Sequence, residues 1–224
     1  MSPIEIGGVE TAGMKKRILV LGASGPTGRE VVKQALEAGH EVTAFVRNPA
    51  KLAMTHDRLS VATGDVTADG PALADAMRGK DAVISALGVG QSFSPHALME
   101  HAMPRILAAM DETGVKRLVL MSAFGVGETF AEIPILPRLF VRTLLARIYA
   151  DKEAGEKVLK RSGLDWTIVY PSGLTNGPRT ENFRFGEHLT MHGFPTVSRA
   201  DVAEFLIEEV DDDQYVRKGV FISS

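Results

Sequence analysis

The stretch RILVLGASGPTGREVVKQAL, residues 17–36, decides the fold class of this chain. Its apolar start predicts a buried strand, a glycine-rich turn follows, and an amphipathic pattern from Thr27 onward predicts a helix. Gly22 begins a tight turn, Gly25 lets a pyrophosphate approach the backbone, and Gly28 lets the helix pack closely against the strand. This order of strand, glycine turn and helix predicts a nucleotide phosphate site.

The N-terminus of this helix forms a further part of the expected site. Its first amide groups have no acceptor within the helix and the helix dipole favours negative charge there, so a phosphate would satisfy both. The Ser24 hydroxyl is a candidate extra donor, and Pro26 and Thr27 complete the turn. The alternative is an ordinary strand-to-helix turn that uses glycine for a positive φ.

Composition excludes several classes of protein. A chain of 224 residues suits one α/β domain and can bury a complete core. The absence of cysteine excludes disulfides and thiolate metal sites, and a formal net charge of −3 provides no positive field for nucleic acid. No stretch resembles a signal peptide or a membrane span. We therefore expect a cytoplasmic protein, a monomer or small homo-oligomer, with a small-molecule substrate and no nucleic-acid or membrane partner.

The rest of the chain alternates strand and helix patterns. Residues 1–14 carry three glycines and no amphipathic period, so we expect a flexible leader there and a single domain over residues 15–224. The expected strands cover residues 41–46, 59–62, 82–86, 117–122, 166–170 and 219–222, and the expected helices residues 71–77, 95–113 and 138–160. Ser198 is a candidate cap for the last helix. This alternation predicts an α/β Rossmann fold, a doubly wound parallel sheet with helices on both faces.

Two stretches resist regular assignment, residues 123–137 and 172–197, and both follow the ends of expected strands. Ligands of open α/β sheets bind outside the carboxyl ends of the strands. We therefore expect these stretches to wall a substrate pocket, the second as a small C-terminal lobe formed by loops. The alternative for each is a variable surface loop.

The end of the second strand predicts the type of dinucleotide. An acidic residue at this place would accept hydrogen bonds from the adenosine ribose, whereas an arginine nearby accommodates a 2′-phosphate. The strand over residues 42–46 ends in Arg47, which favours NADP(H) over NAD(H). Lys51 is a second candidate phosphate partner, and the alternative for Arg47 is a solvated side chain. Later strand ends add further candidates for the adenine, ribose and nicotinamide: Asp65, Val66, Ala86, Leu87 and Gly88.

The segments GASGPTG, VRNP, GDV, ISALG, LMSAFG and KEAGEKVLKRSGLDWTIVYPSGLT resemble atypical short-chain dehydrogenase/reductases. The nearest groups are NAD(P)H-binding proteins similar to biliverdin reductase B and flavin reductase, and NmrA-like proteins. The resemblance runs from about Lys16 to the end of the chain. It implies an NAD(P)H-dependent oxidoreductase. In that superfamily a serine after the fifth strand, and Tyr-x-x-x-Lys on the next helix, carry proton transfer.

Carried onto this chain, the resemblance puts Ser122 in the place of the serine and Lys152 in the place of the lysine, both catalytic and both beside the cofactor. It also puts Tyr170 and Pro171 beside the nicotinamide. The residue four positions before Lys152 is Ile148, and Tyr149 comes one residue late, rotated by about 100° around the helix. We interpret Tyr149 as a partly buried helix residue.

The displaced tyrosine leaves three functions to be weighed against one another. The first is an NADPH-preferring reductase of a small aromatic, flavin, quinone or carbonyl substrate, because hydride transfer to an acceptor that needs no protein acid survives this loss. The second is a non-catalytic NADP(H)-sensing regulator of the NmrA-like kind. The third, a sugar-nucleotide epimerase or dehydratase, is disfavoured without Tyr-x-x-x-Lys. We expect no metal site, because His188 and His192 lack the glutamate of the H-E-x-x-H motif.

Overall fold

The computed structural model of this chain describes residues 5–6, 14–88, 97–127, 129, 146–191 and 193–224. Its strands are β1 (Glu5–Ile6), β2 (Arg17–Leu21), β3 (Glu41–Val46), β4 (Leu59–Thr63), β5 (Ala82–Ser85), β6 (Arg117–Met121), β7 (Asp165–Pro171), β8 (Gly173–Thr175), β9 (Arg184–Gly186), β10 (Thr196–Ser198) and β11 (Lys218–Ser223). Its helices are α1 (Pro26–Glu37), α2 (Gly70–Met77), α3 (Leu98–Thr113), α5 (Ala146–Lys160) and α6 (Arg199–Glu208), and η1 (Pro49–Lys51) is a 3-10 helix. The expected helical residues 95–96 and 138–145 lie outside the described part.

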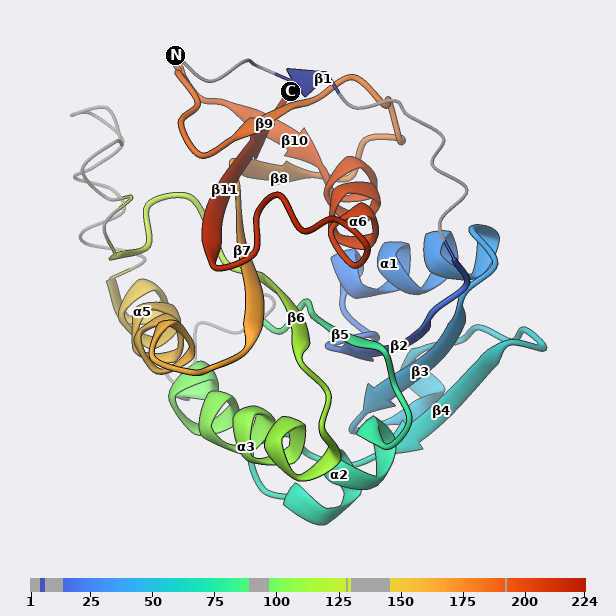
Figure 1. The fold of residues 1–224 in the computed structure, drawn as a ribbon. Coiled ribbons are helices and arrows are strands. Elements are labelled where there is room, and N and C mark those ends of the chain that lie inside the picture. Colours follow the sequence, from blue (N-terminus) through green and yellow to red (C-terminus); the bar gives the residue numbers. More distant parts are fainter. Residues whose placement is uncertain (1–4, 7–13, 89–96, 128, 130–145, 192) are drawn as a thin grey trace.

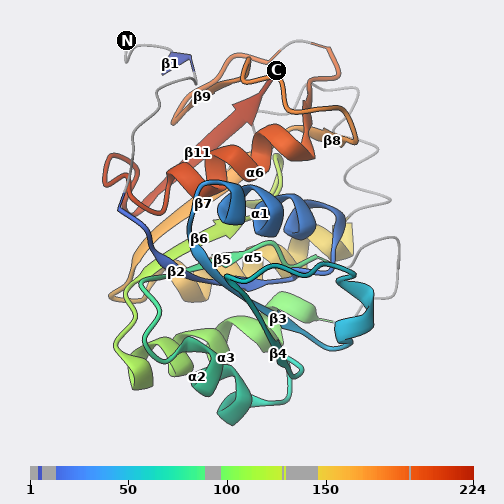
Figure 2. The same ribbon diagram turned by 90° about the vertical axis from the view of Figure 1, so that its right-hand side faces the viewer.

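The described strands form one large sheet in the order β1-β9-β11-β7-β6-β5-β2-β3-β4. Every neighbouring pair from β11 across to β4 is parallel, whereas β9 and β1 run antiparallel to their neighbours. Helices α1 and α6 cover one face, and α2, α3 and α5 cover the other (Figures 1 and 2). The predicted Rossmann fold with a doubly wound parallel sheet is confirmed.

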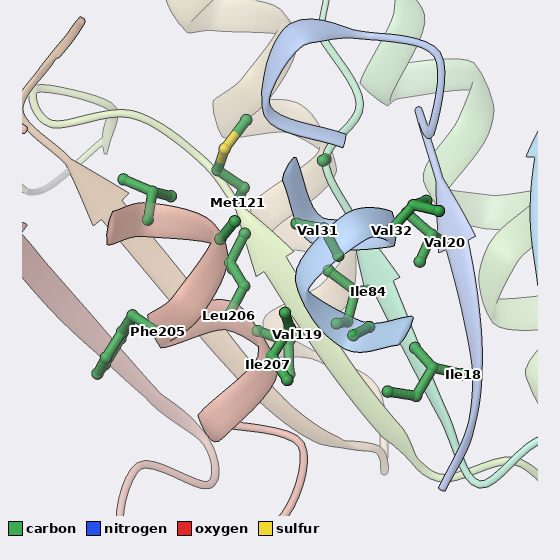
Figure 3. Close-up of a cluster of buried hydrophobic side chains, with 14 of the residues drawn as sticks. Ile18, Val20, Val31, Val32, Ile84, Val119, Met121, Phe205, Leu206 and Ile207 are labelled. Atoms are coloured by element: carbon green, nitrogen blue, oxygen red, sulfur yellow. The ribbon is translucent and has the colours of Figure 1, made fainter. Parts of the chain in front are cut away.

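Both faces of the central strands are buried, which explains their nearly continuous apolar sequence. Ile18 and Val20 of β2 are fully buried beneath α1, whose Val31 and Val32 lie in the same cluster (Figure 3). Leu206 of α6 joins this cluster, so the two helices share one layer of core. Residues of β2 that alternate with these, such as Leu19 and Leu21, belong to the cluster on the opposite face.

The order of the strands creates the place where a ligand can bind. The chain leaves β2 to form β3 and β4 on one side, then crosses back to form β5, β6 and β7 on the other. The loops after β2 and β5 therefore turn away from each other at the edge of the sheet, which leaves a crevice between them. Leu21 pairs with Ser85 across these two strands, so the Gly22 turn and the segment from Ala86 begin side by side.

The ends of the helices carry local signals in the sequence. Pro26 is the first residue of α1, and Gly39, with φ of +91°, follows its last turn. Ser198 caps α6, because its hydroxyl oxygen accepts a hydrogen bond from the amide of Asp201 at 2.9 Å. Helix α3 runs from Leu98 to Thr113 and continues through Pro104.

One expectation needs correction, and the expected leader, which stays a prediction, contains one described strand. The C-terminal lobe is not formed by loops alone, since the stretch 172–197 contains β8, β9 and the start of β10; β8 and β10 pair in parallel, and β9 pairs with β11. Within the expected leader, residues 5–6 are paired as β1 against β9. These strands are two or three residues long, too short to show an alternating pattern in the sequence. The remaining leader residues 1–4 and 7–13, and residues 128 and 130–137 of the other expected loop, lie outside the described part.

Candidate functional site

A cavity of about 1060 Å³ lies at the crevice between the loops after β2 and β5. The ends of β3 and β4 and the start of α3 complete its walls. The structure brings nine residues that the sequence predicted for a cofactor to this cavity: Gly22, Ser24, Gly25, Arg47, Asp65, Val66, Ala86, Leu87 and Gly88. Their role in binding stays a prediction, and their common position is the basis of the site described below.

The glycines of the turn are required by close contacts within the backbone. Gly22 has φ of +78°, and a Cβ there would lie 2.7 Å from the carbonyl oxygen of Ala86. A Cβ on Gly28 would lie 2.1 Å from the carbonyl oxygen of Gly22. Pro26, Thr27 and Gly28 lie in the first turn of α1 and are not among the residues that line the cavity. Gly28 therefore serves the site through packing.

The N-terminus of α1 has no anionic partner of its own. Its cap residue, Gly25, has no side chain to accept a hydrogen bond, and its first turn contains no acidic residue. By contrast, Asp69 caps α2 through the amide of Ala72 at 3.2 Å. Because Gly25 also lines the cavity, the uncapped amides fit a phosphate group at this end.

The carboxylate of Asp65 is fixed in the cavity wall near the end of β4. Its Oδ1 accepts hydrogen bonds from the Thr67 hydroxyl at 2.7 Å and from the Thr67 amide at 2.8 Å. These two bonds lower the pKa of Asp65, the hydroxyl contributing more. Asp65 is therefore an anionic acceptor at neutral pH, which suits the expected contact with an adenine amino group.

Sequence reasoning missed part of the wall. Asn48 directly follows Arg47, and Thr67 belongs to the same turn as Asp65, so both could have been included as neighbours of predicted residues. Ala97, Leu98 and His101 come from the start of α3 and carried no local signal. Only the crossing of the chain back to β5 brings these residues to the cavity.

The predicted catalytic end of the site has a different character. Ser122 directly follows β6, Lys152 lies on α5, and Tyr170 and Pro171 end β7. None of the four is among the residues that line the cavity. The Ser122 hydroxyl donates a hydrogen bond to Oε1 of Glu156 at 2.5 Å. The Tyr170 hydroxyl donates to Oε2 of Glu156 at 2.8 Å. The Ser122 proton expected to serve a substrate carbonyl is thus donated to a carboxylate of the protein.

Glu156 was not predicted as a site residue. It lies four residues after Lys152, so the spacing placed it on the same helix face. Its hydrogen bond with Ser122 joins residues 34 positions apart, and no local sequence pattern predicts such a bond. The signal that was available is a glutamate on the inner face of a helix, where burial requires hydrogen-bonding partners.

Lys152 is half-buried and has no hydrogen bond or ion pair with the described residues. Burial lowers the pKa of its ammonium group, while the nearby carboxylates of Glu156 and Asp151 act in the opposite direction. An ammonium group without a fixed partner can bind an oxygen of a ligand. This position fits the role that the resemblance implies, and that role stays a prediction.

Tyr149 points to the loop after β6. Its hydroxyl donates a hydrogen bond to the carbonyl oxygen of Phe124 at 3.1 Å, and its ring packs against the cluster of buried residues on this face. Burial raises the pKa of Tyr149. These contacts fit the interpretation of Tyr149 as a partly buried helix residue.

The described residues contain no group of three or more histidine, aspartate or glutamate side chains that could hold a metal ion, and His192 lies outside them. In the same part of the chain, no helix combines the length and apolar character needed to cross a membrane.

Comparison with known proteins adds an independent line of evidence. The sequence model of the NAD(P)H-binding family matches residues 22–213. An uncharacterized chloroplastic protein of Arabidopsis thaliana is 33% identical over 232 residues, which cover 98% of this chain and 80% of that protein. The probable pinoresinol-lariciresinol reductase 3 of the same plant is 25% identical over 226 residues, or 93% of this chain and 68% of that protein.

The fold also recurs in solved structures. A short-chain dehydrogenase/reductase from Veillonella parvula, solved in complex with NADP, superposes with a TM-score of 0.77 and 21% sequence identity. The match covers 94% of this chain and 95% of that protein. At this identity the likeness shows the shared fold.

Proposed function

This chain belongs to the NAD(P)H-binding family, as its motifs predicted, and we propose that it is an NADPH-dependent reductase of a small aromatic, flavin, quinone or carbonyl substrate. The observation that carries the proposal is the large cavity at the uncapped N-terminus of α1, lined by the glycine turn and by Arg47. Reductases among the relatives support the reaction class.

Residues of this chain would hold the cofactor in a definite order. The amides of the Gly22–Gly25 turn and of α1 would bind the phosphates, and Asp65 would accept a hydrogen bond from the adenine. Arg47, with Lys51 beside it in the cavity wall, would pair with a 2′-phosphate. A guanidinium at this place, where an acid would select NAD(H), supports NADPH as the preferred cofactor.

The hydrogen bonds of the hydroxyl groups favour flavin or quinone substrates over isolated carbonyls. When bound, NADPH supplies a hydride. The hydroxyl protons of Ser122 and Tyr149 are both donated to protein acceptors, so neither is poised to protonate a substrate. We therefore favour an acceptor such as a flavin or quinone, which takes its proton from water or from Lys152, over an isolated carbonyl.

A sensing role without catalysis is the second candidate. The same engaged hydroxyls favour it, because a regulator needs the cofactor site and no proton donor. In this case occupancy of the cavity would change a surface recognised by a partner. The cytoplasmic location, the oligomeric state and the division at residue 15 stay predictions under either function.

One experiment separates these functions. The purified protein is titrated with NADPH and NADH, and oxidation of NADPH is followed by its absorbance with a panel of flavins, quinones and aldehydes. We expect tight NADPH binding and turnover with a flavin or quinone. Binding without turnover on any acceptor would favour the sensor, and the absence of NADPH binding would refute both functions.

A further inference from the structure

Glu156 is a buried carboxylate at the junction of α5 with the ends of β6 and β7. Its exposed fraction is 2%, and its two hydroxyl partners, Ser122 and Tyr170, are 4% and 3% exposed. The Lys160 ammonium lies 3.8 Å from Oε2 and is the closest cation in the part of the chain that the structure describes. A carboxylate in such surroundings is stable only while both oxygens accept hydrogen bonds, so the geometry of the three groups is strongly coupled.

The direction of these hydrogen bonds limits what Ser122 can do. A hydroxyl has one proton, and an ionised carboxylate can only accept. While Glu156 holds the proton of Ser122, the Ser122 oxygen offers lone pairs to any other group. Ser122 is thereby fixed as a hydrogen-bond acceptor, the reverse of the role that its position in the family pattern implies.

Glu156 also fixes the helix that carries Lys152. The two residues are four positions apart and share one face of α5. One turn of the same helix is tied to α3, because Asp151 accepts hydrogen bonds from the amides of Met99 and Glu100, at 2.9 Å and 3.0 Å. A Cβ on Gly155 would lie 2.9 Å from Cβ of Met99, so the two helices are in close contact there. Glu156 connects α5 to the sheet in the same way, through its hydrogen bonds with Ser122 and Tyr170.

We propose that Glu156 is a positioning residue for the nicotinamide end of the site. It keeps the Ser122 oxygen available as a hydrogen-bond acceptor. It also fixes the position of α5, and therefore of Lys152, relative to the sheet, and it does not contact the cofactor itself. The inference rests on the proposed function, because it presupposes that a nicotinamide ring binds beside Ser122 and Lys152. It predicts that Glu156 affects binding of the nicotinamide part and not binding of the adenosine part.

The test compares Glu156→Gln with Glu153→Gln, using two probes, NADPH and 2′,5′-ADP. The two hydroxyls donate to different oxygens of Glu156, and glutamine replaces one of these oxygens with an NH₂ donor, so one hydroxyl must reorient. Glu153 lies on the same helix in a surface ion pair with Lys157, and its substitution removes the same charge outside the network. The probe 2′,5′-ADP lacks the nicotinamide and reports on the adenosine end alone.

For Glu156→Gln we expect the Kd of NADPH to rise about tenfold, the equivalent of one hydrogen bond, and the Kd of 2′,5′-ADP to stay within about twofold. For Glu153→Gln both constants should stay within about twofold. Equal changes for the two probes, or no change for either, would overturn the proposal. If the wild-type protein does not bind NADPH, the proposed function fails instead.

A second variant covers the case in which Glu156→Gln does not fold. Ser122→Ala removes one hydroxyl donor from Glu156 and leaves its charge in place. It should also raise the Kd of NADPH selectively. Where Glu156→Gln does fold, the two substitutions should be non-additive in a double-mutant cycle, because both act through the same oxygen of Ser122. An unchanged Kd of NADPH in Ser122→Ala would contradict the proposal independently.

Discussion

The two ends of the proposed cofactor site differ in the groups that form them, backbone amides at one end and side chains at the other. The phosphate end consists of backbone: the turn from Gly22 to Gly25, and the first amides of α1, which have no side-chain partner. At the opposite end, side chains bind one another: Ser122 and Tyr170 donate to Glu156, and Asp151 binds the N-terminus of α3. One end is open to an anion, whereas at the other the hydroxyls of Ser122 and Tyr170 are bonded within the protein and Lys152 has no partner among the described residues. Binding and catalysis can therefore diverge within one fold.

The largest effect is expected at the phosphate end, from Gly28→Ala. The new Cβ would lie 2.1 Å from the Gly22 carbonyl oxygen and 2.9 Å from Cα of Ala23, and backbone atoms cannot rotate away. We expect a loss of about 3 kcal/mol in the free energy of unfolding, and no measurable NADPH binding. Urea denaturation and titration with NADPH measure the two effects.

Gly70→Ala is the matched control. Gly70 begins α2, and no atom lies within 4 Å of the Cβ that alanine would add. Its stability should be unchanged or slightly higher, because alanine restricts the unfolded chain. Wild-type stability and affinity in Gly28→Ala would show that the turn does not depend on close packing.

The next effect concerns the choice of cofactor, and the substitution is Arg47→Ala. Loss of a guanidinium that pairs with a 2′-phosphate should raise the Kd of NADPH about 100-fold, and that of NADH less than about threefold. Titration by nicotinamide fluorescence measures both. Arg161→Ala, at an exposed arginine just after α5, controls for the loss of one positive charge. Equal losses for the two cofactors would remove the assignment of Arg47.

The phosphate end could be predicted from the sequence because its causes are local. A turn that needs glycine, a strand that needs apolar residues and a helix that begins at Pro26 all leave marks within about 20 residues. The parallel pairing of the strands then brings Arg47, Asp65 and Ala86 to one edge, since parallel strands share the direction of their carboxyl ends.

The other end could not be predicted, for the opposite reason. The pair Ser122–Glu156 joins a strand end to a helix, and the pair Met99–Asp151 joins two helices 52 residues apart in sequence. Such contacts depend on the position at which each helix packs along the sheet, and no local sequence pattern predicts that position. The family pattern assigns Ser122 and Lys152 to this end, an assignment that stays a prediction, and it carries no information on the direction of a hydrogen bond.

A smaller effect, with opposite signs for stability and binding, is expected from Lys152→Met. Burial lowers the pKa of Lys152 below its ordinary value of 10.5, so the folded state carries a cost for the charge. Methionine has similar length and no charge. We expect the free energy of unfolding at pH 7 to rise, and the Kd of NADPH to rise about tenfold.

The pH dependence sharpens this prediction. Between the folded and the unfolded pKa the unfolded chain binds more protons, so the stability of the wild type increases with pH in that range. The advantage of Lys152→Met should therefore shrink as the pH rises from 7 towards 10, as measured by urea denaturation at several pH values. A constant advantage would mean that the charge of Lys152 is well solvated. Binding of 2′,5′-ADP should be unchanged throughout.

The smallest effect is expected from Tyr149→Phe, which tests whether a tyrosine one residue out of place still serves chemistry. The substitution removes the hydrogen bond to the Phe124 carbonyl, so the free energy of unfolding should fall by about 1 kcal/mol. The rate with the best acceptor, and its pH profile from 6 to 9, should not change. Burial raises the pKa of Tyr149, whereas a proton donor at neutral pH needs a lower one. A tenfold fall in kcat would instead identify this tyrosine as the proton donor. It would then assign catalysis to the end of the site that contains Ser122 and Lys152.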